Sequence, residues 1–137
     1  MSLFNIFNIS GSAMSAQSIR LNVTASNLAN AQSVGGDEAS TYRSRSPVFS
    51  AMMKSFEGDN LSYGVEVKGV VNSNTPLQTR YQPEHPMANE DGNVFLPNVN
   101  VVDEMANMIS ASRSYQSNVE VLNTSKQLMM ATLRLGQ

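Results

Sequence analysis

The sequence predicts a mainly α-helical protein with a small β-rich insertion, in which the N- and C-terminal helices pair as a coiled coil. Three observations lead to this prediction. The C-terminal third carries an uninterrupted heptad pattern, a shorter helical pattern lies near the N-terminus, and short alternating runs separated by Gly, Pro and Asn lie between them.

The C-terminal pattern runs from Val101 to Leu135 and repeats apolar residues at alternating steps of four and three. A period of 3.5 is typical of helices that wrap around others in a left-handed supercoil. Asn100 is a suitable N-cap, and Arg134 followed by Gly136 suits the C-terminal end. Such a helix would be about 52 Å long, so we expect an elongated molecule.

A second helical pattern runs from Ala13 to about Asn30. We expect residues 1–11 to form a loose or partly helical lead, with Ser10 or Ser12 capping the helix that follows. Its small residues allow a partner backbone to approach closely. Because each terminal stripe is too narrow to be stable alone, we expect the two helices to pack together and close the chain into one loop.

The middle of the chain predicts a connection and several short strands. Gln32 to Ser40 has the composition of a flexible connection. Glu90-Asp91-Gly92-Asn93 has the chemistry of a tight turn. The expected strands are 41–53, an edge or irregular strand because of Pro47, then 65–71, 77–81 and 94–96. The chain thus divides into segments 1–31, 32–97 and 98–137.

The two expected helices differ in length, and this difference predicts contacts with other subunits. If both start level, about 25 Å of the longer helix has no cover within the chain. Exposed apolar side chains forgo the stabilisation of burial, so we expect neighbouring subunits to cover them. The predicted assembly interface comprises Met14, Leu21, Ala25, Leu28, Val101, Met105, Met108, Ile109, Ser112, Tyr115, Val119, Leu122, Met129 and Leu133.

The composition argues against several classes of protein. The net charge is −2 and charged residues make up 15% of the chain, whereas about 25% is usual. No basic run extends beyond Arg43 and Arg45, so nothing indicates nucleic-acid binding. No apolar run is long enough for a membrane span, the first nine residues do not form a convincing secretory signal, and cysteine is absent.

The chemistry-bearing residues do not predict an enzyme. His85 lies between two prolines beside Glu84 and has no second histidine or cysteine with which to bind a metal. Glu90 and Asp91 lie in a turn, whereas paired catalytic carboxylates need a cleft that separates their pKa values. We therefore expect no catalytic, cofactor-binding or metal-binding residue, no cofactor and no small-molecule substrate.

Two terminal motifs resemble the bacterial flagellar rod and hook axial protein family. They are Ser10–Gln17 followed by Leu21–Ala31, and Pro97–Met105 followed by Met108–Val119. The middle of the chain, with Tyr42–Arg45, Gly64–Val67 and Tyr81–Pro86, is similar to the short proximal-rod type of this family.

The resemblance implies a structural subunit of the flagellar basal-body rod, which assembles through its terminal helices into the tubular drive shaft that transmits torque. It also implies a periplasmic location and export by the flagellar type III apparatus without a cleaved signal. The implied partners are other rod proteins, copies of the chain itself, the export apparatus and basal-body ring components. An alternative function is a helical adaptor that binds one partner helix in its exposed seam.

Overall fold

A computed structural model describes residues 3–56 and 60–135. In chain order, the elements are α1 (Leu3–Asn30), β1 (Arg45–Phe56), β2 (Asn60–Asn72), β3 (Gln78–Tyr81), β4 (Asn93–Leu96) and α2 (Val101–Leu135). Two long terminal helices with two small antiparallel sheets between them confirm the predicted mainly α architecture with a β-rich insertion.

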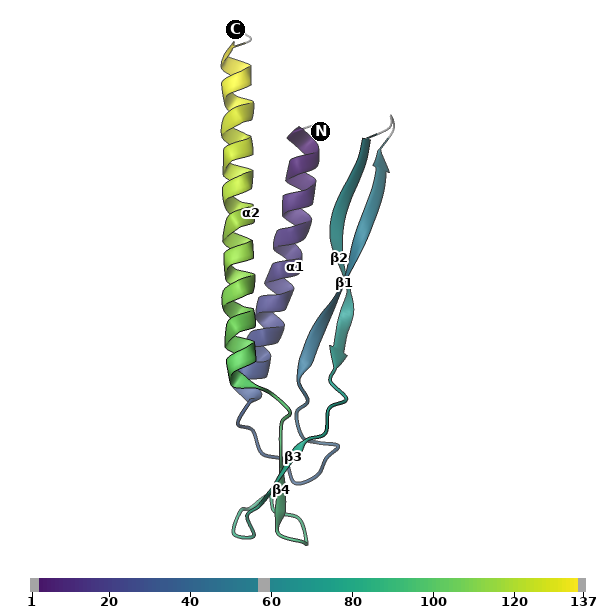
Figure 1. Ribbon diagram of the computed structural model, residues 1–137, viewed down its shortest axis with the longest axis vertical. Coiled ribbons are helices and arrows are strands. Elements are labelled where there is room, and N and C mark those ends of the chain that lie inside the picture. Colours follow the sequence, from purple (N-terminus) through teal and green to yellow (C-terminus); the bar gives the residue numbers. More distant parts are fainter. Residues whose placement is uncertain (1–2, 57–59, 136–137) are drawn as a thin grey trace.

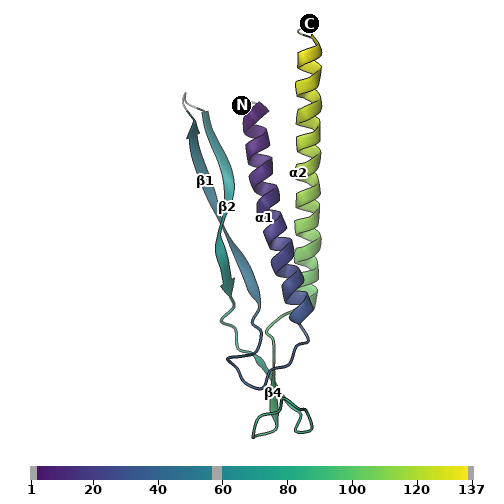
Figure 2. The same cartoon turned by 180° about the vertical axis from the view of Figure 1, so that it is seen from behind.

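The molecule is elongated, and its long axis follows the helices (Figure 1). α1 and α2 run antiparallel and pack side by side, so the N-terminal and C-terminal helices are in direct contact, as the sequence predicts. The β1–β2 hairpin lies along α1, on the side away from α2 (Figure 2). The β3–β4 hairpin extends beyond the ends of the helices where α1 finishes and α2 begins.

α2 begins and ends as its sequence predicts. The side-chain oxygen of Asn100 accepts hydrogen bonds from the backbone N–H of Val102 at 3.0 Å and of Asp103 at 3.5 Å. These bonds satisfy two of the backbone donors that a helix start leaves free, so the predicted N-cap is confirmed. Gly136, expected just after the helix, lies outside the described residues.

α1 is longer than predicted, because helix continues from Leu3 through Ser10-Gly11-Ser12. A glycine inside a helix costs about 1 kcal/mol relative to alanine, but packing along the rest of α1 outweighs this local cost. The prediction that Ser10 or Ser12 caps the helix is therefore wrong. Ser10 is buried within α1, while the Ser12 hydroxyl donates to the Ile9 carbonyl at 2.8 Å and accepts the Val65 N–H at 3.2 Å.

The β1–β2 hairpin confirms the strands predicted at 41–53 and 65–71, with somewhat different bounds. Their antiparallel register pairs Arg45 with Asn72 and Phe56 with Asn60, with an irregularity between Val48 and Phe49. Because the sheet has only two strands, each strand is an edge, and Pro47 is tolerated there. The bond from Val65 to Ser12 fastens β2 to α1.

The shorter hairpin confirms the predicted strands 77–81 and 94–96 and the turn between them. β3 pairs with β4 in a register that places Tyr81 opposite Asn93. Gly92 has φ +75°, a left-handed conformation that costs a residue with a side chain about 1–2 kcal/mol. A Cβ on Gly92 would also lie 2.9 Å from the ring of Tyr81.

The connection expected to be flexible is held by hydrogen bonds. Gly35 and Phe95 exchange backbone hydrogen bonds of 2.9 and 3.0 Å, which attaches this segment to β4. A Cβ at Gly35 would collide with the Thr41 hydroxyl, so only glycine fits there. Thr41 in turn donates to the Asp37 carbonyl at 2.6 Å. The sequence did not predict these bonds, because their partners are distant in the sequence or belong to the backbone.

The apolar core is thin for a chain of this length. Among the described residues, the buried apolar side chains are Ala16, Val94, Pro97 and Ala111. The accessible surface is 9432 Å², whereas a compact monomer of 14.9 kDa would expose about 7,000 Å². The chain therefore folds around small residues and leaves much of its apolar surface exposed.

The left-handed glycine provides a test of the β3–β4 turn. We expect Gly92→Ala to lower the free energy of unfolding by about 1–2 kcal/mol, the cost of a left-handed conformation for alanine. Gly69→Ala is the control, since a Cβ there meets nothing within 4 Å. Urea unfolding followed by circular dichroism measures both, and equal midpoints would contradict the proposed strain.

Candidate assembly surfaces

The face of α2 that packs on α1 also has a period of 3.5, but it is rotated from the predicted seam. Among the buried or half-buried residues of α2, Glu104, Met108, Ala111, Tyr115, Asn118, Leu122, Ser125 and Met129 recur at steps of four and three, and Asn107, Ser112, Ser114 and Val119 lie beside them. Half of these positions, such as Met108 and Tyr115, belong to the predicted seam, whereas the buried Ala111 and Ser125 each lie one residue before a seam position. Small side chains in contact allow the two helix axes to approach closely.

The fourteen predicted interface residues therefore divide into two groups. Half-buried in this chain are Met14, Leu21, Leu28, Met108, Ser112, Tyr115, Val119, Leu122 and Met129. Exposed are Ala25, Val101, Met105, Ile109 and Leu133. Nine of them are thus half-buried within the chain and five lie at the surface, where other molecules can reach them.

An apolar surface runs along the first half of α2, and we call it the outer stripe. It consists of Val102, Met105 and Ile109, with exposed fractions of 73%, 53% and 53%. Steps of three and four place these side chains on one face of the helix. Neither hairpin packs against α2, so among the described residues nothing covers this stripe.

The β1–β2 hairpin also exposes apolar side chains, and neighbours such as Val70 and Val71 point to opposite faces of the two-stranded sheet. The exposed side chains are Val48, Phe49, Met53, Tyr63, Val65, Val70 and Val71. A two-stranded sheet is marginally stable alone, and α1 provides its support within the chain. Large exposed apolar patches are typical of surfaces that contact other proteins.

Asn27, which is fully buried, joins three parts of the fold. Its side-chain nitrogen donates to the Arg45 carbonyl at 2.8 Å and to Glu104 Oε1 at 3.0 Å. Its side-chain oxygen accepts the Tyr42 hydroxyl at 2.8 Å and the Arg45 N–H at 3.0 Å. All four hydrogen-bonding positions of the carboxamide are used, and they fix α1 against α2 and the start of β1.

Tyr42 is the polar neighbour of this carboxamide. Burial raises the pKa of Tyr42, the Arg45 charge opposes that rise, and the Glu104 carboxylate adds to it. The Arg45 guanidinium also lies 5.2 Å from the centre of the Tyr42 ring, within the range of a cation–π contact. The neutral phenol is therefore the form that this site stabilises.

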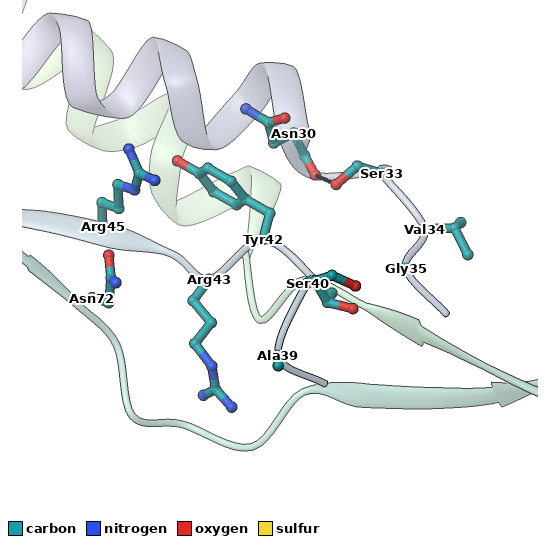
Figure 3. A pocket seen from close by; sticks show the side chains of 11 residues that line it. Asn30, Ser33, Val34, Gly35, Ala39, Ser40, Tyr42, Arg43, Arg45 and Asn72 are labelled. Atoms are coloured by element: carbon teal, nitrogen blue, oxygen red, sulfur yellow. Dashed lines mark hydrogen bonds between the residues drawn. The ribbon is translucent and has the colours of Figure 1, made fainter. Parts of the chain in front are cut away.

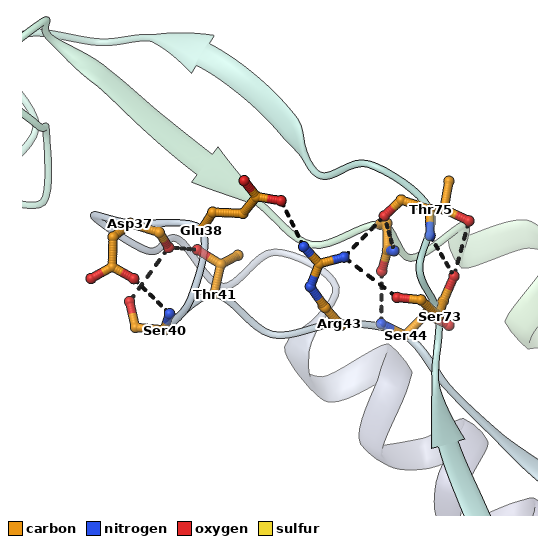
Figure 4. Close-up of polar contacts among 9 residues, drawn as sticks. Asp37, Glu38, Ser40, Thr41, Arg43, Ser44, Ser73 and Thr75 are labelled. Carbon is orange, nitrogen blue, oxygen red and sulfur yellow. Dashed lines mark hydrogen bonds and ion pairs between the residues drawn. The ribbon is translucent and has the colours of Figure 1, made fainter.

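Consecutive side chains of the segment before β1 point in opposite directions, with Tyr42 toward α1 and Arg43 away from it (Figure 3). Arg43 pairs with Glu38 at 2.7 Å and donates to the Thr75 carbonyl at 3.2 Å (Figure 4). Asn98 accepts the Ser44 N–H and donates to the same Thr75 carbonyl, both at 2.7 Å. These bonds join the segments that lead into β1, β3 and α2.

The hollow beside this segment is lined mainly by polar side chains, among them Asn30, Ser33, Ser40 and Asn72 (Figure 3). His85 lies elsewhere, in the β3–β4 turn, where its Nδ1 accepts the Met87 N–H at 3.1 Å. Within residues 3–56 and 60–135, no group of three His, Asp or Glu side chains is placed to hold a metal ion. In the same residues, neither helix is long and apolar enough to cross a membrane.

Comparison with known proteins identifies the family. The model of flagella basal body rod proteins matches residues 7–35, and the model of the C-terminal region of flagellar basal body rod FlgEFG proteins matches residues 91–135. The flagellar basal-body rod protein FlgC of Escherichia coli O157:H7 is 53% identical over the full length of both chains. Those of Yersinia enterocolitica and Salmonella typhimurium LT2 are 52% and 51% identical, also over both full lengths. The chain belongs to the FlgC family.

The match to the model of flagella basal body rod proteins, over residues 7–35, includes Asn27, a residue that the apolar pattern alone did not single out as important. The missed signal is a polar heptad in α1: Ser10, Gln17 and Thr24 recur at steps of seven, as do Arg20 and Asn27. Ser10, Thr24 and Asn27 are buried, and Arg20 donates to Asn107 of α2 at 2.8 Å. Counting apolar residues alone overlooks a seam built from small polar ones.

Removing the Asn27 carboxamide tests its role. We expect Asn27→Ala to lower the free energy of unfolding by about 1–3 kcal/mol, because the backbone of Arg45 and the Tyr42 hydroxyl lose their partner. Asn22→Ala, at an exposed position of α1, is the matched control for the change in helix propensity. Urea unfolding compares the two, and an equal effect of both changes would show that the buried bonds contribute nothing.

The raised pKa of Tyr42 predicts how stability responds to high pH. Its contribution is fully present below the unfolded pKa of about 10 and is lost as pH rises through the higher folded value. We expect Tyr42→Phe to remove this part of the alkaline loss, whereas Tyr81→Phe, at an exposed ring, retains it. Urea unfolding across this range measures the difference, and parallel curves for Tyr42→Phe and the unsubstituted chain would contradict it.

Proposed function

We propose that this FlgC-family chain is a structural subunit of the flagellar rod that assembles through its terminal helices. The observation that carries the proposal is the combination of a thin core with a large exposed apolar surface on α2 and on the β1–β2 hairpin. Fully burying one large apolar side chain stabilises by about 1.5–3 kcal/mol. Contacts between subunits therefore supply stabilisation that the isolated chain lacks.

Within each subunit, α1 and α2 pair as an antiparallel coiled coil. The period of 3.5 in the α2 residues that face α1 supports this pairing. Segments 1–31 and 98–137 then form one helical domain, and residues 32–97 form the inserted module that lies along it. The hydrogen bonds of Asn27 support a fixed angle between domain and module.

The proposed role is mechanical, and no side chain takes part in catalysis. Subunits meet through unlike surfaces, a geometry that generates a helical tube. Many such contacts in parallel would transmit torque along the rod. The names of the FlgC relatives as rod proteins support this role.

The remaining features are inferred from the family. The chain would leave the cytoplasm through the flagellar type III export apparatus without a cleaved signal and join the rod in the periplasm. Its partners would be other rod proteins, copies of itself and, during export, the export apparatus. Basal-body ring components are further candidate partners for the inserted module.

The adaptor alternative also uses the exposed stripe, and the form of the complex distinguishes the two functions. An adaptor forms a soluble complex of fixed stoichiometry with one partner helix. A rod subunit is incorporated into basal bodies, and cells that lack it assemble no complete rod. Electron microscopy of basal bodies from a deletion strain decides between them.

A charge in the outer stripe tests the proposed interface. We expect Ile109→Asp to abolish the rescue of swimming in a deletion strain, because a carboxylate would be buried between subunits without a partner. Ser110→Asp is the matched control, since Ser110 is the adjacent exposed residue on another face of α2. Soft-agar motility, with immunoblots for equal protein amounts, measures the effect. Normal swimming with Ile109→Asp would exclude this stripe from the interface.

A further inference from the structure

The outer part of the β1–β2 hairpin turns its apolar side chains away from α1. We call residues 49–53 and 63–67 the distal arm. A Cβ on Gly64 would lie 3.6 Å from the Cβ of Ser12, so the face of the arm that carries Gly64 is turned toward α1. Side chains alternate between the two faces of a sheet, and paired residues share a face. The opposite face therefore carries Phe49, Ala51, Met53, Tyr63, Val65 and Val67, all exposed except Val67.

This orientation makes the contact between the distal arm and α1 a weak one. The face toward α1 consists of Ser50, Met52, Gly64 and Glu66. Small and polar residues bury little apolar area, and hydrophobic stabilisation is proportional to that area. In the described part of the chain, one hydrogen bond joins the arm to α1, from the Val65 N–H to the Ser12 hydroxyl at 3.2 Å, and it is exposed. Water can replace either partner of an exposed bond, so its net contribution is small.

The other part of the hairpin is held firmly to α1. We call residues 45–48 and 69–72 the base. Both backbone groups of Arg45 bond to the Asn27 carboxamide, at 2.8 and 3.0 Å. Asn27 is fully buried, and a buried polar group that loses its partner is not compensated by water. The base therefore stays in place when the distal arm does not.

A structural irregularity separates the distal arm from the base. The register shifts between Val48 and Phe49, and Lys68 of β2 has no partner in β1. Such a bulge bends a strand and increases its twist, and the two strands cross midway along the hairpin in Figures 1 and 2. Gly69 lies beside the bulge, and a Cβ there would meet nothing within 4 Å. Neighbouring atoms therefore do not block bending at this point.

We propose that the distal arm is a strap that opens from α1 by bending at this bulge while the base stays fixed. The open arm presents its apolar face, and the face of α1 around Ser12, to neighbouring subunits during assembly. The arm is the part that moves because it leaves few contacts behind and carries an apolar face that burial stabilises. This inference rests on the proposed function and adds a conformational change to it.

Hydrogen exchange of the purified full chain, followed by NMR, distinguishes bending from unfolding. Bonded and non-bonded pairs alternate along an antiparallel ladder. Since the Val65 N–H bonds to Ser12, Ser50 and Glu66 form a pair that is bonded across the strands. Bending exposes the Val65 amide and leaves the amides of Ser50 and Glu66 bonded. The Arg45 amide, bonded to Asn27, reports on the base.

After correction for intrinsic rates, we expect the Val65 amide to exchange at least tenfold faster than those of Ser50, Glu66 and Arg45. Equal rates for Val65 and Arg45 would show that the arm does not open separately from the base. Equal rates for Val65, Ser50 and Glu66 would show that the arm unfolds instead of bending. Either result overturns the proposal.

A disulfide between the arm and α1 tests the role of opening in cells. The Cβ separation of 3.6 Å between positions 12 and 64 suits a disulfide, and the sequence has no other cysteine. A deletion strain carries Ser12→Cys/Gly64→Cys as its only copy. We expect its swimming in soft agar to fall severalfold and to recover with a thiol reductant. Strains with Ser12→Cys or Gly64→Cys alone are the controls, and we expect them to swim equally with and without reductant.

Immunoblots of non-reducing gels report how much of the double variant carries the disulfide. Normal swimming with the disulfide complete overturns the strap and leaves the rod function intact. Failure of the unsubstituted chain to restore swimming overturns both. If the disulfide does not form in cells, the exchange rates decide the proposal alone.

Discussion

The buried carboxamide of Asn27 is the contact on which the arrangement of the elements depends. It bonds to the first residue of β1 through both backbone groups, to Tyr42 and to Glu104 of α2. A buried amide left without partners would cost about 1–3 kcal/mol, so these bonds favour one register over its neighbours. The same register leaves the C-terminal end of α2 beyond the beginning of α1 (Figure 1).

The contact between α1 and α2 buries little apolar surface. Its small side chains instead allow the two helix axes to approach closely, and its polar side chains form hydrogen bonds. Ala111 and Ser125 are buried in it, while larger apolar residues of α2 such as Met105 and Val102 face outward. A conventional seam of large aliphatic residues would bury more surface within one chain. It would also leave less apolar surface for other copies. A subunit that must add to a rod benefits from the second distribution, because the free energy of burial is then released on assembly.

Two glycines show that the inserted module depends both on local backbone conformation and on contacts between distant residues. The turn before β4 needs a left-handed backbone at position 92, and glycine adopts that conformation without a steric cost. Gly35 is equally required, but for a reason that its neighbours do not reveal: its Cβ position is occupied by Thr41, and its backbone bonds to Phe95. The FlgC-family chain thus holds its inserted module through backbone and small polar groups, and among the described residues of the module the buried apolar side chains are Val94 and Pro97.

The sequence by itself determined the elements whose causes are local. The α2 boundaries follow from the Asn100 cap and an uninterrupted heptad, and the strands follow from alternation and turn residues. Only the tertiary structure decided the early start of α1, the rotation of the α2 seam toward Ala111 and Ser125, and the role of Asn27. Each depends on which residues distant in sequence meet, and a local pattern does not encode that. The exposed positions Met105, Ile109 and Leu133 were expected at an interface from their periodicity, but their freedom from α1 became visible only with the helices side by side.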